Sequence, residues 1–238
     1  HRKGAQDKKR AKIFSRLGRE ISVAVKSGGA DPDSNIRLRS AINAAKSLNM
    51  PKDNIDRAIK KGEGNDPDSN YQEVRYEGYG PDGIAIIIEA MTNNKNRTAA
   101  EIRSTFSKHG GNLAEHGSVS FSFKRLGNII LEKQYASEEE LFDFLIENGS
   151  EDLDVNENDY SIYCDQKILH QLNEKIIKQF GQTTSFELIW KSERNIDIHK
   201  ESAEKLFKLI NSLEENDDVQ TVSSNFEVSE EVMQSLTA

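Results

Sequence analysis

The chain has 238 residues, of which 35% are hydrophobic and 30% are charged, and its formal net charge is −8. This low apolar fraction favours several small hydrophobic cores over one large core. The single cysteine, Cys164, excludes an intrachain disulfide framework, and no apolar run approaches the roughly 18 residues that cross a membrane. We therefore expect a soluble, cytoplasmic protein of two or three domains.

The positive charge is concentrated at one end of the chain. Residues 1–61 hold 16 of the 32 Lys and Arg residues but only 6 of the 40 Asp and Glu residues, so their net charge is +10 while the remainder carries −18. From Gly127 onward the net charge is −16. Ordinary solubility explains an acidic surface of this kind better than the alternative, which is contact with basic proteins.

Residues 5–26 predict one long amphipathic helix with a cationic face. The apolar stripe recurs at spacings of three and four and consists of Phe14, Leu17, Ile21, Ala24 and Val25. Scattered Lys and Arg usually indicate only a solvated helix face, but that reading expects interleaved carboxylates, and only Asp7 and Glu20 are present. The dense positive charge therefore favours an anionic partner.

Two shorter helices complete a basic helical domain, residues 1–62. We expect one helix after a cap at residues 31–34 and another that starts at Pro51 and stops at Gly62. The connection at residues 28–34 is too long for the tight turn of a helix-turn-helix motif. The candidate phosphate-binding residues are Lys3, Lys8, Lys9, Lys12, Arg16, Arg19, Lys26, Arg37, Arg39, Lys46, Lys52, Arg57, Lys60 and Lys61.

A polar linker, residues 63–70, follows this domain. The pentapeptide Asp-Pro-Asp-Ser-Asn occurs at 31–35 and again at 66–70. An EF-hand calcium loop needs glycine at its sixth position, where this chain has Ile36 and Tyr71. Both copies therefore predict turns and caps, and no metal site.

The pattern at residues 71–126 predicts an α/β unit with too few strands and helices to form a complete domain. The pattern favours a hairpin of strands 71–79 and 84–91, a helix at 97–109 and a half-buried strand at 119–123. Two polar loops, 92–98 and 108–112, could bind phosphates, although helix capping with Gly110 and Gly111 at positive φ explains them better. Their candidate contact residues are Asn94, Arg97, Lys108 and His109.

The rest of the chain predicts a second α/β domain inserted in the first. Residues 127–191 have the β-α-β-β-α-β order of a ferredoxin-like domain. A later helix around 203–213 and a strand at 219–228 need a sheet to join. We therefore expect an α+β fold: a three-helix basic domain followed by a discontinuous α/β domain (71–126 with 198–238), which carries the ferredoxin-like domain (127–197).

Four separated stretches resemble the YebC/PmpR family, to which mitochondrial translational activators are related. They are HRKGAQDKKRAKIF at 1–14, MPKDNIDRAIKKG at 50–62, YEGYGP at 76–81, and NRT with KHGGN between 96 and 112. The resemblance extends over essentially the whole chain. It implies transcriptional regulation through DNA, while relatives in the same family act on translation at the ribosome.

The sequence contains no catalytic motif. It has no Gly-x-Ser-x-Gly, no His-x-x-x-His and no dinucleotide fingerprint, and its carboxylates lie in surface-like runs such as 138–140 and 214–218. We therefore expect neither an enzyme nor a cofactor. The leading hypothesis is a DNA-binding regulator whose Lys and Arg contact phosphates, and these contacts carry no sequence code.

Two other classes of function stay open at this point. One is a ribosome-associated translation factor that binds ribosomal RNA and contacts basic ribosomal proteins, and the other is a protein-interaction adaptor. Reversal of Lys9, Lys12 and Arg16 to Glu should abolish nucleic-acid binding without unfolding the distal domains. The oligomeric state is open as well.

Overall fold

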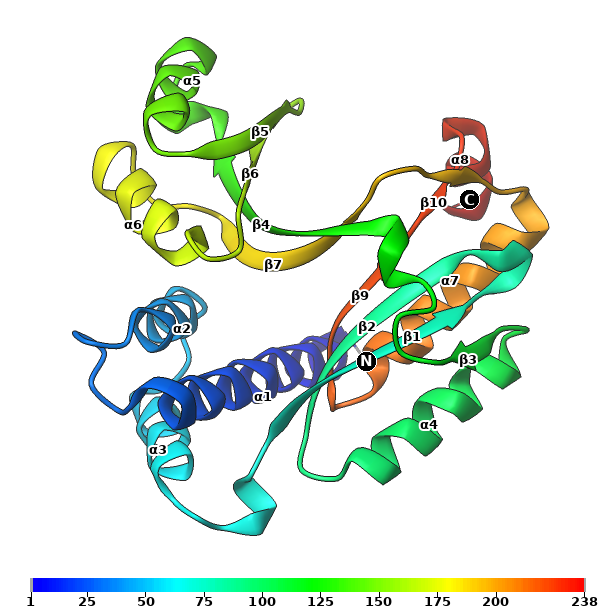
Figure 1. Cartoon of the computed structure of the whole chain (residues 1–238), viewed down its shortest axis with the longest axis horizontal. Helices are drawn as coiled ribbons and strands as arrows, with labels where there is room; N and C mark the ends of the chain where they lie inside the picture. The colour runs from blue at the N-terminus through cyan, green and yellow to red at the C-terminus, as the bar shows by residue number, and fades with distance from the viewer. Residues whose placement is uncertain (1, 238) are drawn as a thin grey trace. The chain divides into compact units, whose positions relative to one another are not determined.

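The computed structural model describes residues 2–237 and the side chains of residues 6–235. The fold is α+β, as expected, with a helical N-terminal domain and two α/β domains, one inserted in the other (Figure 1). The chain forms two compact units. The first comprises the residues up to 123 together with those from 192 onward, and the second comprises residues 124–191. The helical domain thus shares one compact unit with the discontinuous α/β domain.

The basic head, residues 1–62, is built from α1 (Arg2–Gly28), α2 (Ile36–Ser47) and α3 (Lys52–Glu63). Its core joins the expected apolar stripe of α1 to Leu38 of α2 and Ile55 of α3. At the end of α3, a Cβ on Gly62 would lie 2.6 Å from the carbonyl oxygen of Ser22. Only glycine permits this close approach between α3 and α1.

The helix caps differ in detail from the expectation. We expected residues 31–34 to cap the second helix, but the N-cap is Asn35, whose Oδ1 accepts the backbone N–H of Leu38 at 3.1 Å. The Nδ2 of the same buried side chain donates to the carbonyl oxygen of Ala24 at 2.8 Å and so also closes the end of α1. Pro51 is the N-cap of α3 and not its first helical residue.

The repeated pentapeptides form turns, as predicted. Asp31 Oδ1 accepts the backbone N–H of Asp33 at 3.0 Å, and Asp66 Oδ1 accepts that of Asp68 at 3.1 Å. The second copy contains the short 3₁₀ helix η1 (Pro67–Ser69). The two copies therefore begin with the same turn, but they end differently, because Asn35 is the N-cap of α2 and Asn70 is the C-cap of η1.

A four-stranded sheet in the order β3-β1-β2-β9 forms the first α/β domain. The expected hairpin consists of β1 (Gln72–Tyr79) and β2 (Ala85–Thr92), joined through η2 (Pro81–Gly83). The helix α4 (Lys95–Lys108) follows, and then β3 (Asn112–Ala114), a short strand that the sequence did not predict.

The last part of the chain completes this sheet. It supplies the helix α7 (Lys200–Glu215) and the strand β9 (Val219–Ser224), and β9 pairs antiparallel with β2. Ile86 of β2, Phe106 of α4 and Leu206 of α7 lie in one core. The helix–strand pair thus joins the sheet that lacked it, as expected.

Residues 119–123 do not form the strand that their alternating pattern predicted. Residues Ser120–Ser122 form the 3₁₀ turn η3, and the side chain of Phe121 is 79% exposed. The buried carboxylate of Glu77 holds the turn by accepting backbone N–H groups from Gly117, Val119 and Ser120. Burial alone would raise the pKa of Glu77, but these donors outweigh it and lower the pKa. A contact from β1 therefore overrides the local pattern.

The expected strand at 219–228 is broken at Asn225. Its buried side chain accepts the backbone N–H of Ala85 at 2.8 Å, at the end of the pairing between β9 and β2. Beyond it, β10 (Phe226–Glu227) pairs in parallel with β8 (Ile196–Asp197) in a separate two-stranded sheet. The helix α8 (Glu230–Thr237) follows, which the sequence did not predict.

The second unit has the predicted β-α-β-β-α-β order, and its sheet runs β5-β6-β4-β7. One core joins Ile129, Leu141, Ile162 and Leu172 across the sheet and both helices. The elements are β4 (Phe123–Glu132), the turn η4 (Lys133–Tyr135), α5 (Glu138–Glu147), β5 (Ser150–Val155), β6 (Asp159–Cys164), α6 (Leu169–Gln179) and β7 (Ser185–Ser192). Within residues 2–237, no helix is long and apolar enough to cross a membrane.

Candidate nucleic-acid interface

The lysines of the head supply its exposed positive charge. Apart from the half-buried Lys12, the described lysines extend into solvent from all three helices, and none has a hydrogen bond or ion pair to another described side chain. The side chain of Lys3 lies outside the described residues. The exposed lysines are Lys8, Lys9 and Lys26 on α1, Lys46 on α2, and Lys52, Lys60 and Lys61 on α3.

Several predicted arginines instead bind groups of the protein itself. Arg37 donates from Nε and Nη2 to the two carboxylate oxygens of Glu20 at 2.7 and 3.0 Å, and Nη2 also donates to Glu73 at 2.8 Å. Burial opposes the charge of Arg37, but the two carboxylates outweigh it and raise the pKa. Arg39 donates to the carbonyl oxygen of Pro32 at 2.7 Å. These side chains position the helices and their turns.

One side of α1 faces the acidic end of α7. Arg16 Nη2 donates to the carbonyl oxygen of Glu214 at 2.6 Å, which satisfies a free carbonyl in the last turn of α7. Burial lowers the pKa of the nearby Lys12, while Asp217 and Glu215 partly oppose this shift. The predicted cationic face of α1 is therefore divided. Lys12, Arg16 and Arg19 are half-buried against carboxylates, whereas Lys8, Lys9 and Lys26 are exposed.

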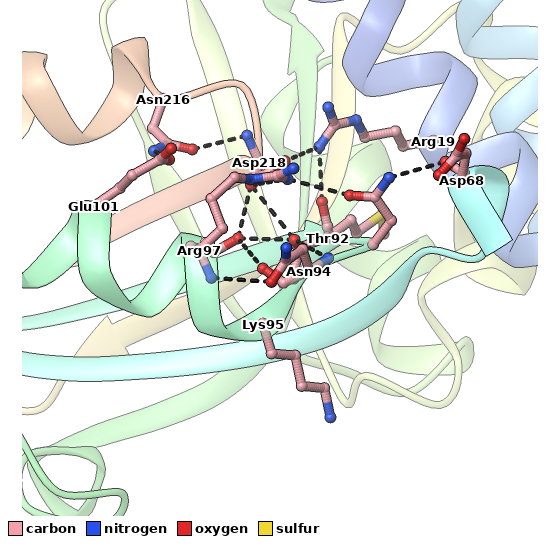
Figure 2. Close-up of polar contacts among 12 residues, drawn as sticks. Arg19, Asp68, Thr92, Asn94, Lys95, Arg97, Glu101, Asn216 and Asp218 are labelled. Atoms are coloured by element: carbon pink, nitrogen blue, oxygen red, sulfur yellow. Dashed lines mark hydrogen bonds and ion pairs between the residues drawn. The ribbon is translucent and has the colours of Figure 1, made fainter.

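Asp218 is the centre of a buried polar cluster (Figure 2). Arg19 of α1 donates to it at 2.6 Å, Arg97 of α4 at 2.9 Å, and the hydroxyl of Thr98 at 2.7 Å. Burial would raise the pKa of Asp218, but these donors outweigh it and lower the pKa. The run 214–218 is therefore not the plain surface run that we expected, because Asp218 is only 3% exposed.

The two polar loops flank α4 and cap it. Asn94 is the N-cap and accepts the backbone N–H of Arg97 at 3.0 Å, and His109 is the C-cap, with Nε2 3.1 Å from the hydroxyl of Ser212. Gly110 has the expected positive φ of 77°, whereas Gly111 does not. A Cβ on Gly111 would lie 2.4 Å from the carbonyl oxygen of Tyr79. Lys108 is exposed, and Lys95 points away from the Asp218 cluster (Figure 2).

A second group of cations lies along the line where α1 meets α3. Lys26 and Lys61 line one small hollow there, and Lys61 and Arg57 line a larger groove. Arg57 is exposed and donates to Asp53 and Asn54 of its own helix. The seam thus presents positive charge from two helices, which suits the spaced charges of a phosphate backbone.

Sequence reasoning missed Asp218 and Tyr71 as site residues. Tyr71 lies at the end of the linker, and the guanidinium carbon of Arg19 is 4.8 Å from its ring centroid. Asp218 directly precedes a buried strand residue, Val219, which was the available signal that this carboxylate is buried. Among the described residues, no group of three or more His, Cys, Asp or Glu side chains could hold a metal ion.

The comparisons with known proteins agree over nearly the whole chain. Residues 1–65 match a family model described as the TACO1/YebC protein N-terminal domain. Residues 71–226 match the model of the TACO1/YebC second and third domain, whose short name, Transcrip_reg, refers to transcriptional regulation. These models identify a regulatory family and confirm the resemblance inferred from the four sequence stretches.

A solved structure is similar over the same extent. It is the crystal structure of a conserved hypothetical protein, Aq1575, from Aquifex aeolicus. The two proteins share 45% sequence identity, with a TM-score of 0.86, and the match covers 94% of this chain and 93% of the other. The fold is thus shared over almost the full length of both proteins.

Proposed function

The chain belongs to the TACO1/YebC family, and we propose that it is a non-enzymatic, nucleic-acid-binding regulator of gene expression. One observation carries this proposal: seven lysines of the head are exposed and have no hydrogen bond or ion pair to the described side chains, although the protein as a whole is acidic. Uncompensated lysines on neighbouring helices repel one another, and an anionic ligand relieves that repulsion.

The exposed cations favour phosphate binding over base recognition. Lysine acts as a compact point charge. Arginine can form two hydrogen bonds to one base edge, but most arginines of the head already donate hydrogen bonds to groups of the protein itself. Binding through phosphates is sequence-independent. The family's link to transcription makes DNA the leading ligand.

Ribosomal RNA is the second candidate ligand. The chain carries a net charge of −16 from Gly127 onward, which would repel nucleic acid but attract basic proteins. A ribosome presents both RNA and basic proteins, so a basic head and an acidic remainder would each find a partner there. In that case the protein would regulate translation.

A charge-reversed variant tests the phosphate contacts. Lys26→Glu with Lys61→Glu should weaken binding to a fluorescent DNA duplex and to a ribosomal RNA fragment, measured by anisotropy. The matched control reverses Lys200 and Lys208, two exposed lysines of α7, and changes the net charge equally. If about six phosphates are contacted, wild-type affinity should fall about a thousandfold between about 50 and 200 mM salt. Equal binding by both variants, or no salt dependence, would refute the proposal.

Ribosome co-sedimentation separates the two ligands. Association with ribosomes without binding to duplex DNA would support the translation role, and the reverse result would support transcription. The triple reversal of Lys9, Lys12 and Arg16, which the sequence suggests, is a less specific test. Lys12 and Arg16 are half-buried against the acidic end of α7, so their reversal would also disturb the fold.

A further inference from the structure

The head contains an open groove between α1 and α3, with a volume of about 350 Å³. Phe14 of α1, Met50 and Tyr71 supply apolar surface, and Arg19, Arg57 and Lys61 supply positive charge. The groove is open because α1 presents small side chains on this side, among them Ala11 and Gly18. The groove therefore offers apolar surface next to positive charge, whereas the exposed lysines elsewhere on the head offer positive charge alone.

The charge of the groove favours an anionic occupant. Among the described residues that line it there are three cations and no Asp or Glu. The Nε–H of Arg19 is buried and has no acceptor among the described residues. Asp218 already neutralises the charge of Arg19, but a neutral peptide or a basic partner would leave the charges of Arg57 and Lys61 uncompensated. A phosphate-containing ligand would compensate them.

The apolar part of the groove requires more than a phosphate. Phe14 and Tyr71 present ring surface, and each ring has an arginine near one face, Arg10 at 5.2 Å and Arg19 at 4.8 Å from the ring centroids. Nucleic-acid bases stack on aromatic rings and on guanidinium planes. This stacking is independent of base identity, because every base has a π-face. A base with its own phosphate matches both surfaces of the groove.

Building on the proposed function, we propose that this groove binds an unstacked base of single-stranded nucleic acid, with Arg57 and Lys61 at the adjacent phosphates. A duplex keeps its bases paired and stacked, so it can offer its phosphates to the head but no base to the groove. The head would then prefer single-stranded segments over duplexes. This preference goes beyond the phosphate contacts that the exposed lysines provide.

Gly18 allows the groove to be filled without damage to the head. A Cβ added at this position would meet only Met50 Cε, at 4.0 Å, which is an ordinary contact. Leucine also favours the helix more than glycine does. Gly18→Leu should therefore fold at least as well as the wild type while occupying the groove. Ala100→Leu, at an exposed position of α4, is the matched control.

The experiment compares three fluorescent probes by anisotropy at matched salt: a short single-stranded RNA, the same backbone with abasic sites, and a DNA duplex. Wild type and Ala100→Leu should bind the RNA about 5- to 140-fold more tightly than the abasic strand, as expected from base stacking. Gly18→Leu should bind both strands equally, with the affinity that the wild type has for the abasic strand.

The outcomes separate this proposal from the proposed function. Equal wild-type affinity for the RNA and the abasic strand, tighter binding of the duplex, or undiminished RNA binding by Gly18→Leu would overturn the base site while leaving phosphate binding intact. Failure of the wild type to bind any probe at low salt would overturn the proposed function itself, and the base site with it.

Discussion

At the scale of single residues, Asp218 links the head to the α/β domain. Its carboxylate accepts hydrogen bonds from Arg19 of α1 and from Arg97 and Thr98 of α4, and Arg19 also donates to the carbonyl oxygen of Met91 at 2.8 Å. Such a cluster is stable only when all its members are present, because a buried charge without its partner is costly. Asp218 therefore holds α1 in place against the sheet.

Replacement of this carboxylate should destabilise the protein in a pH-dependent way. Asp218→Asn leaves Arg19 and Arg97 without their countercharge, and we expect the free energy of unfolding to fall by about 3 kcal/mol at neutral pH. Because the folded-state pKa of Asp218 is lowered, this stabilisation is complete above its ordinary value of 3.8 and is lost as the pH falls through the folded-state pKa. Denaturant titrations at several pH values measure the difference.

The neighbouring carboxylate provides the control for this measurement. Asp217 is exposed, and Asp217→Asn should change the free energy of unfolding by less than about 0.5 kcal/mol. Equal effects of the two substitutions, or an Asp218→Asn effect that persists at low pH, would show that the cluster does not depend on the charge of Asp218.

At the scale of elements, α1 organises the head because its sides contact different neighbours. Its apolar stripe packs on α2 and α3, its half-buried cations face the end of α7, and its remaining lysines are exposed. The close packing of α3 depends on Gly62, where a Cβ would also lie 2.6 Å from the Cβ of Val25. The shape of the groove between α1 and α3 follows from this contact and from the small side chains of α1.

Two glycines near the end of α3 should respond in opposite ways to substitution by alanine. Gly62→Ala should lower the free energy of unfolding by about 1–3 kcal/mol, because the added methyl group forces α3 away from α1. At Gly64 the nearest atom to a new Cβ is the carbonyl oxygen of Lys60, at 3.5 Å, and φ is −79°. Gly64→Ala should therefore be neutral or slightly stabilising. Thermal unfolding of both variants tests this contrast, and a stable Gly62→Ala variant would mean that α3 shifts without cost.

At the scale of the whole molecule, the chain consists of two units with separate cores. The second unit has its own core around Ile129, Ile162 and Leu172. The backbone N–H of Glu193 donates to the carbonyl oxygen of Ser122 at 3.1 Å, so the two chain segments that enter and leave this unit are adjacent. Adjacent ends allow an inserted domain to fold without threading through its host.

Residues 124–191 should therefore fold when expressed alone. Cys164 reports on that fold, because it is fully buried and burial raises the pKa of its thiol to about 11. We expect the excised unit to unfold cooperatively, as followed by circular dichroism, and its thiol to react with a thiol reagent only after denaturant is added. Rapid reaction in native buffer would show that the core needs the rest of the chain.

The sequence by itself determined the main elements, the fold class and the family. Apolar periodicity is a local signal, so the helices of the head and the ferredoxin-like order of residues 127–191 could be predicted from it. It failed where a distant group decides the local conformation, as at residues 119–123, where the carboxylate of Glu77 holds a turn. It also failed at Asn225, whose bond to Ala85 ends a strand that the pattern would have continued.

Only the tertiary structure decided which charges of the basic head are available to a ligand. Composition shows the excess of Lys and Arg, but whether a cation is neutralised depends on partners elsewhere in the chain. Arg19 and Asp218 are 199 positions apart, and Arg16 contacts Glu214 across 198 positions. No local pattern encodes such a contact, because the free energy of an ion pair or a hydrogen bond depends on distance in space and on burial, and folding alone sets both.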